Sequence, residues 1–136
     1  RWVTKNELLE RSDYISLNCP LTDETRHLIS NQESEIMKCD SVLINTARGP
    51  VVNEKELYNA LKNGEIGSAG LDVYEREPEV YQPLLEMENV VLAPHIGSST
   101  VTTRTKMASL AAEGLIKVLR GEVPTNIVNK EVMERR

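Results

Sequence analysis

Short apolar runs alternate along the chain with segments whose apolar residues recur at helical spacing. The apolar runs occupy residues 14–19, 41–45, 68–73 and 90–93. Each run has the length of a buried strand, and Pro20 closes the first one because proline cannot donate to a sheet ladder. Strands that alternate with helices in this way are typical of strand–helix units on a parallel sheet. The pattern therefore predicts an α/β fold.

Helix starts are marked by capping signals between these runs. Thr4 with Glu7, and Ser30 with Glu33, both match the capping box, in which the side chains and backbone of a helix start bond each other. A further helix is expected between an Asn53 cap and Gly64, since glycine readily takes the left-handed conformation that ends helices. Helices are thus predicted through residues 8–11, near 32–37, after residue 53 and at about 100–119, with a short turn of helix at 83–87.

The last of these helices is the longest, and its apolar sector is broad. Two neighbouring stripes run along it, which predicts a helix that is covered on two sides. We expect it to cross between two domains. The first stripe is Ala108, Ala112, Leu115 and Leu119, and the second is Met107, Ala111, Gly114 and Val118.

Composition narrows the class of protein. The 136 residues suffice for one ordinary domain, and a formal charge of −5 disfavours a nucleic-acid surface. No apolar run approaches the 18 residues of a membrane span, and the chain does not start like a signal peptide. Cys19 and Cys39 lack metal-ligand spacing, so we expect no metal, and we interpret both as reduced packing residues of a cytoplasmic protein.

Residues whose side chains can bind a substrate or transfer a proton follow three of the predicted strands. Arg48 comes after the second strand, Asp72 and Glu77 lie at and beyond the end of the third, and His95 follows the fourth. In open parallel sheets, ligands bind beyond the carboxyl ends of the strands. An arginine can hold a carboxylate bidentately, and an imidazole can exchange a proton near neutrality. A carboxylate paired with that imidazole would raise its pKa.

Each of these residues also has a simpler interpretation. Arg48 can close a loop by binding backbone carbonyls, and Glu77 can be a solvated acid in a charged loop. The buried Asp72 needs a donor, which can be a ligand amide or a backbone N–H. His27, in a polar loop, is interpreted as structural.

Three motifs in a fixed order favour the functional interpretation of the arginine, the glutamate and the histidine. They are Asn-Thr-Ala-Arg-Gly at 45–49, Gly-Leu-Asp-Val at 70–73 with Glu77-Pro78, and Ala-Pro-His-Ile-Gly-Ser at 93–98. Together with Cys-Pro-Leu-Thr at 19–22 and Gly-Glu-Val-Pro at 121–124, they resemble the D-isomer-specific 2-hydroxyacid dehydrogenases. That family includes glyoxylate, hydroxypyruvate, D-lactate and phosphoglycerate dehydrogenases. The resemblance covers nearly the whole chain, and the overall sequence pattern is most similar to that of glyoxylate and hydroxypyruvate reductases.

The resemblance implies a fold and a domain plan. Residues 1–98 would be the C-terminal half of a Rossmann-type, doubly wound parallel sheet that binds NAD or NADP. Residues 99–120 would be an interdomain linker helix, and residues 121–136 a stub of the substrate domain. The glycine-rich Gly-x-Gly-x-x-Gly turn that cradles a pyrophosphate is missing from the sequence. We therefore expect negligible dehydrogenase activity and weak dinucleotide binding from these residues alone.

The resemblance also assigns the site. Arg48 would hold the 2-oxo acid, and His95, kept protonated by Glu77, would give a proton to the carbonyl oxygen as hydride arrives. The substrate would be a small 2-oxo or 2-hydroxy acid, and family members commonly pair as homodimers through the cofactor domain. The expected cofactor contacts are Cys19, Pro20, Thr46, Ala47, Arg48, Asp72, His95, Ile96, Gly97 and Ser98.

Two other classes of protein stay open at this point. Transcriptional corepressors that resemble the same family sense dinucleotides on the same fold, and an intact arginine, glutamate and histidine does not guarantee turnover. The chain can also be a partial fold that serves as an interaction module.

Overall fold

The computed structural model describes residues 1–129, 131 and 132 of the chain. The chain divides into two compact units, Arg1–Gly97 and Ser98–Arg136. The first unit ends next to the predicted boundary of the cofactor domain at residue 98. The assignment of the later segments to a linker and to a substrate domain stays a prediction.

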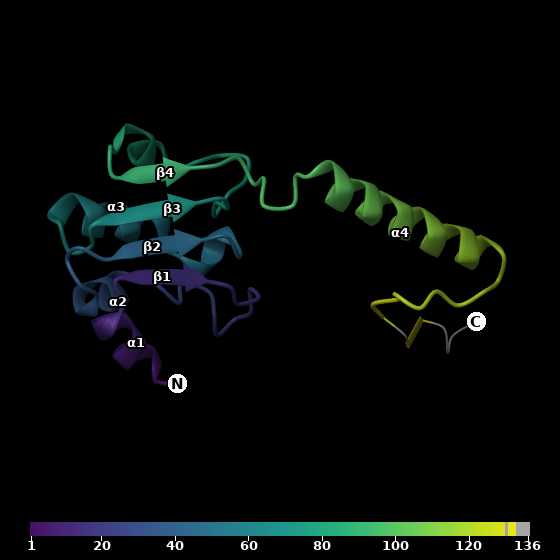
Figure 1. The fold of residues 1–136 in the computed structure, drawn as a ribbon, viewed down its shortest axis with the longest axis horizontal. Helices are drawn as coiled ribbons and strands as arrows, with labels where there is room; N and C mark the ends of the chain where they lie inside the picture. Colours follow the sequence, from purple (N-terminus) through teal and green to yellow (C-terminus); the bar gives the residue numbers. More distant parts are fainter. Residues whose placement is uncertain (130, 133–136) are drawn as a thin grey trace. The chain divides into compact units, whose positions relative to one another are not determined.

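The first unit is built on a sheet of four parallel strands in the order β1-β2-β3-β4 (Figure 1). Leu17, Asn45, Leu71 and Leu92 lie side by side across the sheet. The carboxyl ends of all four strands therefore meet at one edge, as the alternating pattern predicted. The strands are β1 (Tyr14–Leu17), β2 (Val42–Asn45), β3 (Ser68–Leu71) and β4 (Val90–Leu92).

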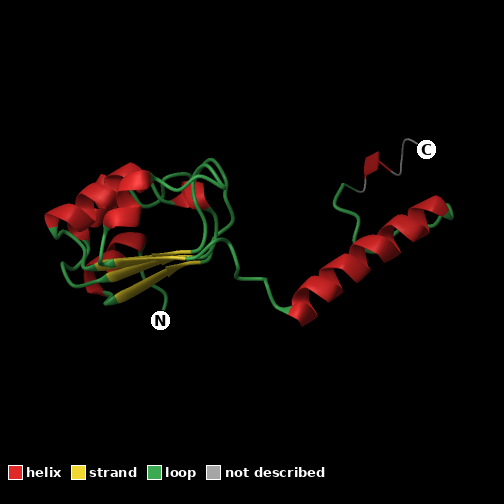
Figure 2. Ribbon diagram, turned by 90° about the horizontal axis from the view of Figure 1, so that it is seen from above, coloured by secondary structure: helices red, strands yellow, loops and turns green. Residues whose placement is uncertain are grey.

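The helices of this unit lie on one face of the sheet (Figure 2). Side chains that point to this face from the strands, such as Ile15, Leu43 and Ala69, are buried, whereas Tyr14 is 75% exposed and Val91 73% exposed. The hydrophobic core thus lies between the helices and one face of the sheet. The helical elements are α1 (Lys5–Arg11), α2 (Asn31–Ile36), η1 (Gly49–Val51), α3 (Glu54–Asn63) and η2 (Gln82–Glu86).

The predicted caps explain where the helices begin and end. Ser30 and Glu33 form the capping box of α2, and the Asn53 side chain accepts the third N–H of α3. Gly64 ends α3 with a φ of 74°, which is the left-handed conformation that glycine tolerates. At α1 only half of the box forms: Thr4 accepts from the backbone of residue 7, but the carboxylate there bonds Arg11 instead.

Other details differ from the sequence prediction. The first and third strands end two residues earlier than expected, because the chain enters the loops beyond the strand ends at residues 18 and 72. The Asp72 N–H still donates to the Asn45 carbonyl of β2 at 3.0 Å. The 3-10 turn η1 was not predicted, and Pro50 fits its first turn because proline needs no hydrogen-bond partner there. Cys39 is exposed, so its interpretation as a packing residue is wrong, whereas Cys19 packs against the core.

The second unit contains α4 (Val101–Leu119), which begins after the Thr100 cap and is followed by Gly121 in the left-handed conformation. No residue of α4 is buried, so the predicted cover of its two apolar stripes stays a prediction. Among the residues that the structure describes, no helix combines the length and apolar character of a membrane crossing.

Candidate active site

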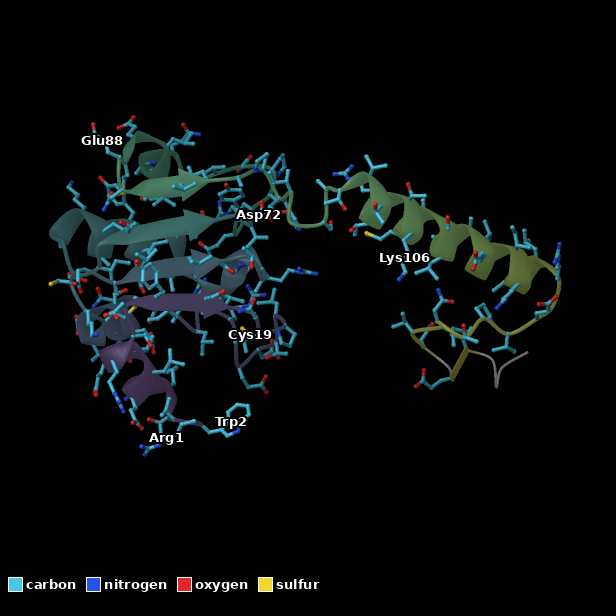
Figure 3. All side chains as sticks on the ribbon, viewed as in Figure 1. Arg1, Trp2, Cys19, Asp72, Glu88 and Lys106 are labelled. Atoms are coloured by element: carbon cyan, nitrogen blue, oxygen red, sulfur yellow. The ribbon has the colours of Figure 1, made fainter. Side chains whose placement is uncertain are left out.

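The predicted site residues of the first unit gather beyond the carboxyl ends of the strands. Figure 3 shows the labelled Cys19 and Asp72 at the arrowhead edge of the sheet, whereas Glu88 lies at the opposite edge. This position follows from the aligned strand register. It is the edge at which open parallel sheets bind ligands.

A groove of about 540 Å³ opens beyond β1 and β2. Its walls come from the two loops that leave these strands, so residues nearly thirty positions apart in the chain face the same space. Five of the predicted cofactor residues line it. The lining residues are Asn18, Cys19, Pro20, Leu21, Thr46, Ala47 and Arg48.

Asn45 fixes the loop that carries Arg48. It is only 1% exposed, its Nδ2 donates to the Arg48 carbonyl at 3.0 Å, and its Oδ1 accepts from the Ala47 N–H at 3.1 Å. No role of its own was predicted for Asn45. The available signal was a polar residue on the inward face of a strand beside Leu43, where a buried amide needs partners.

The Arg48 side chain is exposed, and its Nη1 donates to the Ala47 carbonyl at 2.7 Å. This contact is of the kind that the simpler interpretation anticipated. It uses one of the five N–H donors of a guanidinium, so the others remain available for a carboxylate or a carbonyl oxygen.

Glu77 and His95 form a pair. Glu77 Oε2 lies 2.8 Å from His95 Nδ1, and Glu77 Oε1 accepts from the Tyr74 N–H at 3.1 Å. The hydrogen bond with His95 lowers the pKa of Glu77 and, with the Tyr74 N–H and the charges of His95 and Arg48, outweighs the opposing effect of burial. The carboxylate therefore stays charged at neutral pH, with one of its oxygens at hydrogen-bond distance from the imidazole ring.

Asp72 holds the loop that follows His95. Its Oδ1 accepts from the Ile96 N–H at 2.7 Å, and its Oδ2 accepts from the Gly97 N–H at 2.8 Å. Of the two donors left open by the sequence, the structure thus provides the backbone one. His95 itself has a φ of 53°, an uncommon value for a residue with a side chain, and such strain persists where neighbouring contacts enforce it.

Further cofactor contacts stay predictions. Asp72 retains lone pairs for a ligand amide, because each carboxylate oxygen can accept more than one bond. Ser98 is the first residue of the second unit, and its contact with the cofactor also stays a prediction. In the described part of the chain, no three His, Cys, Asp or Glu side chains lie together as a metal ion would require.

His27 is more firmly held than a loop histidine needs to be. Its Nε2 lies 2.6 Å from Glu75 Oε1, and the Glu75 N–H donates to Glu54 Oε1 at 2.7 Å. Burial raises the pKa of Glu54, and the negative charge of Glu75 adds to this increase. These contacts join the loop after β1 to α3 and to the segment after β3, which agrees with the structural interpretation of His27.

The fold and the groove define a nucleotide-binding α/β domain, with ligand-facing residues at the carboxyl ends of parallel strands. The family model for the D-isomer specific 2-hydroxyacid dehydrogenase, NAD binding domain, matches residues 1–97. The chain belongs to this family. The resemblance inferred from the sequence motifs is therefore confirmed, and so is the Rossmann-type α/β fold.

Relatives with known names agree with this assignment. A glyoxylate reductase from Korarchaeum cryptofilum is 52% identical over an alignment of 136 positions, which covers 99% of this chain and 41% of that protein. The crystal structure of TT0316 protein from Thermus thermophilus matches with a TM-score of 0.88 at 43% identity, over 93% of this chain and 40% of that one. An NADPH-dependent glyoxylate/hydroxypyruvate reductase from Sinorhizobium meliloti, in complex with NADP and malonate, matches with a TM-score of 0.80 at 38% identity, over 84% and 36%.

The chain spans about two fifths of the length of these relatives. Its family and its cofactor-binding domain are thus established, whereas the activity of the whole protein is a matter for proposal.

Proposed function

We propose that the protein containing this chain is an NAD(P)-dependent 2-hydroxyacid dehydrogenase that reduces small 2-oxo acids such as glyoxylate or hydroxypyruvate. The observation that carries the proposal is the Glu77–His95 pair at 2.8 Å, with the charge of Arg48 acting on the same carboxylate. A histidine proton donor paired with a charged carboxylate, with a guanidinium near enough to act on that carboxylate, is suited to a carbonyl that gains negative charge.

The residues at the strand ends fit a dinucleotide. The groove beyond β1 and β2 is lined partly by small residues, Cys19, Thr46 and Ala47, so a flat ring can approach the backbone. Asp72 holds the N–H groups of Ile96 and Gly97 toward itself and is proposed to accept from the carboxamide as well. Ser98 and Pro20 complete the proposed contacts. When bound, the reduced dinucleotide supplies the hydride that the carbonyl carbon receives.

The roles of the three remaining side chains follow from their chemistry. Arg48 holds the substrate carboxylate and polarises the carbonyl oxygen. His95 gives its proton to that oxygen, so that the 2-oxo acid becomes a 2-hydroxy acid and the imidazole is left neutral. Glu77 orients the ring and stabilises its charged form. In the reverse direction, neutral His95 takes the hydroxyl proton.

The family resemblance supports two further parts of the proposal: the whole protein is a homodimer that pairs through the cofactor domain, and it works in the cytoplasm. We also expect residues 1–136 alone to have negligible dehydrogenase activity, because the sequence contains no glycine-rich pyrophosphate turn.

The direct test follows NAD(P)H absorbance with the full-length protein and glyoxylate or hydroxypyruvate. We expect oxidation of the dinucleotide that depends on the 2-oxo acid. Tight dinucleotide binding without turnover of any 2-oxo acid would instead identify a dinucleotide sensor of the corepressor type. The reductase names of the relatives favour the enzyme over that alternative.

Replacing Glu77 by glutamine in the full-length protein is expected to move the alkaline limb of the reduction rate to lower pH by about one unit. Reduction needs the protonated imidazole, and its rate falls as the pH rises and the proton is lost. The neutral amide stabilises the imidazolium less than the carboxylate does, so the proton leaves at a lower pH. The measurement is kcat/KM against pH for the parent and for Glu77→Gln.

Glu79→Gln is the matched control for Glu77→Gln, because it removes an exposed carboxylate of the same loop. Its profile should coincide with that of the parent. A profile of Glu77→Gln that also coincides with the parent would mean that the pair does not control protonation.

A further inference from the structure

Tyr74 contacts the segments that carry the three candidate catalytic residues. It follows Asp72 and Val73 at the end of β3, and only 6% of its surface is exposed. Its hydroxyl donates to the Ala93 carbonyl at 2.7 Å, with a longer contact of 3.3 Å to the Leu71 carbonyl. Burial, with the negative charge of Asp72, raises the pKa of this phenol, so the hydroxyl stays a donor at neutral pH.

The same residue holds both partners of the Glu77–His95 pair. Its backbone N–H donates to one oxygen of Glu77 at 3.1 Å, and the other oxygen of that carboxylate lies 2.8 Å from His95 Nδ1. Its hydroxyl meanwhile binds Ala93, two residues before His95. Tyr74 thus closes a ring of contacts around the pair: its backbone N–H binds Glu77, and its hydroxyl binds the segment that leads to His95.

Tyr74 also contacts the turn that carries Arg48. A Cβ added to Gly49 would lie 1.9 Å from the carbonyl carbon and the carbonyl oxygen of Tyr74. The two backbones are therefore packed directly against each other, without a side chain between them. The position of the Arg48 backbone is consequently set against the same residue that holds the acid and the imidazole.

We propose that Tyr74 is a positioning residue. Its hydroxyl fixes the segment Ala93–His95, so that the imidazole faces Glu77. The imidazole then gives its proton to the substrate that Arg48 holds. The proposal rests on the proposed function, because it concerns the same reaction. Tyr74 is not proposed to touch the reacting atoms. It acts through Ala93 and through Glu77.

The test is Tyr74→Phe in the full-length protein, which removes the hydroxyl and leaves the ring in the core. We expect kcat for the 2-oxo acid to fall by about two- to tenfold, the effect of losing one hydrogen bond. The KM for the 2-oxo acid should change little, since Arg48 is retained. The alkaline limb of the reduction rate should move to lower pH, because the loosened imidazole is stabilised less by Glu77.

Tyr58→Phe is the matched control. Tyr58 lies on α3 with its ring edge-on to Tyr81, and its hydroxyl makes no hydrogen bond within the described residues. The same chemical change there should leave kcat and the pH profile as in the parent. Three charged groups lie on the segments around His95: Glu77, Arg48, and Asp72, which binds the N–H groups of Ile96 and Gly97. Both variants retain all three groups.

Two results for Tyr74→Phe would overturn the proposal. One is an unchanged kcat with an unchanged alkaline limb. The other is a lower kcat with an unchanged limb, which indicates only a general loss of structure. A measurement that does not need turnover is the pH titration of the histidine ring signals in NMR spectra. The signals of His95 are identified because they are missing from the spectrum of His95→Gln.

That readout separates the two proposals. If the parent protein turns over no 2-oxo acid, the proposed function fails, and the titration of His95 alone decides the role of Tyr74. A titration that moves to lower pH in Tyr74→Phe but not in Tyr58→Phe supports the positioning role. Equal titrations in the parent and in Tyr74→Phe overturn it.

Discussion

Replacing Arg48 by alanine in the full-length protein is expected to lower kcat/KM for the 2-oxo acid by about 10²- to 10³-fold. The guanidinium would stabilise negative charge on the carbonyl oxygen, which affects kcat. It would also bind the substrate carboxylate, so KM should rise about tenfold or more. Stability should be little affected, because the side chain is exposed and its one intramolecular hydrogen bond goes to the preceding carbonyl. Steady-state kinetics and urea unfolding measure the two effects separately.

Two further variants sharpen the Arg48 experiment. Arg48→Lys keeps the charge but loses the planar fork, so we expect an activity between those of the parent and of the alanine variant. Arg11→Ala removes an exposed arginine that pairs with Glu7 on α1, and its activity should equal that of the parent. If Arg48→Ala were as active as Arg11→Ala, the arginine would be only a loop-closing residue.

Gly49→Ala is expected to cost about 3 kcal/mol or more in the free energy of unfolding. The added Cβ would lie 1.9 Å from backbone atoms of Tyr74 and 2.5 Å from the backbone N of Glu75. Backbone atoms cannot move aside as a flexible side chain can, so the turn and the segment after β3 have to separate. The loss of stability is measured by urea unfolding, and loss of activity should accompany it because Arg48 moves with the turn.

Gly70→Ala is the control for this substitution. Gly70 lies in the middle of β3, and the nearest atom to an added Cβ there is Ile44 Cγ1 at 4.0 Å, an ordinary contact distance. We expect it to change the unfolding free energy by less than about 1 kcal/mol. Equal stabilities for the two alanine variants would contradict the close backbone approach at Gly49.

The candidate site was partly visible in the sequence because polar residues interrupt apolar runs. Arg48, Asp72 and His95 each follow a strand, and parallel strands bring such positions to one edge of the sheet. Their partners were less visible. No role was predicted for Tyr74, since nothing in the local pattern shows that its hydroxyl binds a carbonyl nineteen residues later.

For Asp72, the sequence predicted that the carboxylate needs donors but not which donors it has. Its position inside an apolar run indicated that a buried carboxylate needs donors, and this part of the prediction is confirmed. The sequence did not decide between a ligand amide and the backbone. That choice depends on how the loop after β4 returns over β3, and in the structure the loop places the N–H groups of Ile96 and Gly97 against the carboxylate.

The sequence by itself determined the parallel α/β architecture, the capping box of α2, the caps of α3, and the edge at which the chemistry lies. These features depend on residues within a few positions of one another, or on a repeated strand–helix order. Only the tertiary structure decided the left-handed backbone of His95, the contact of Gly49 with Tyr74, and the ring of hydrogen bonds that holds Glu77 and His95. The physical reason is that these features arise from contacts between loops 18 to 25 residues apart, where the strand register sets the distance between groups.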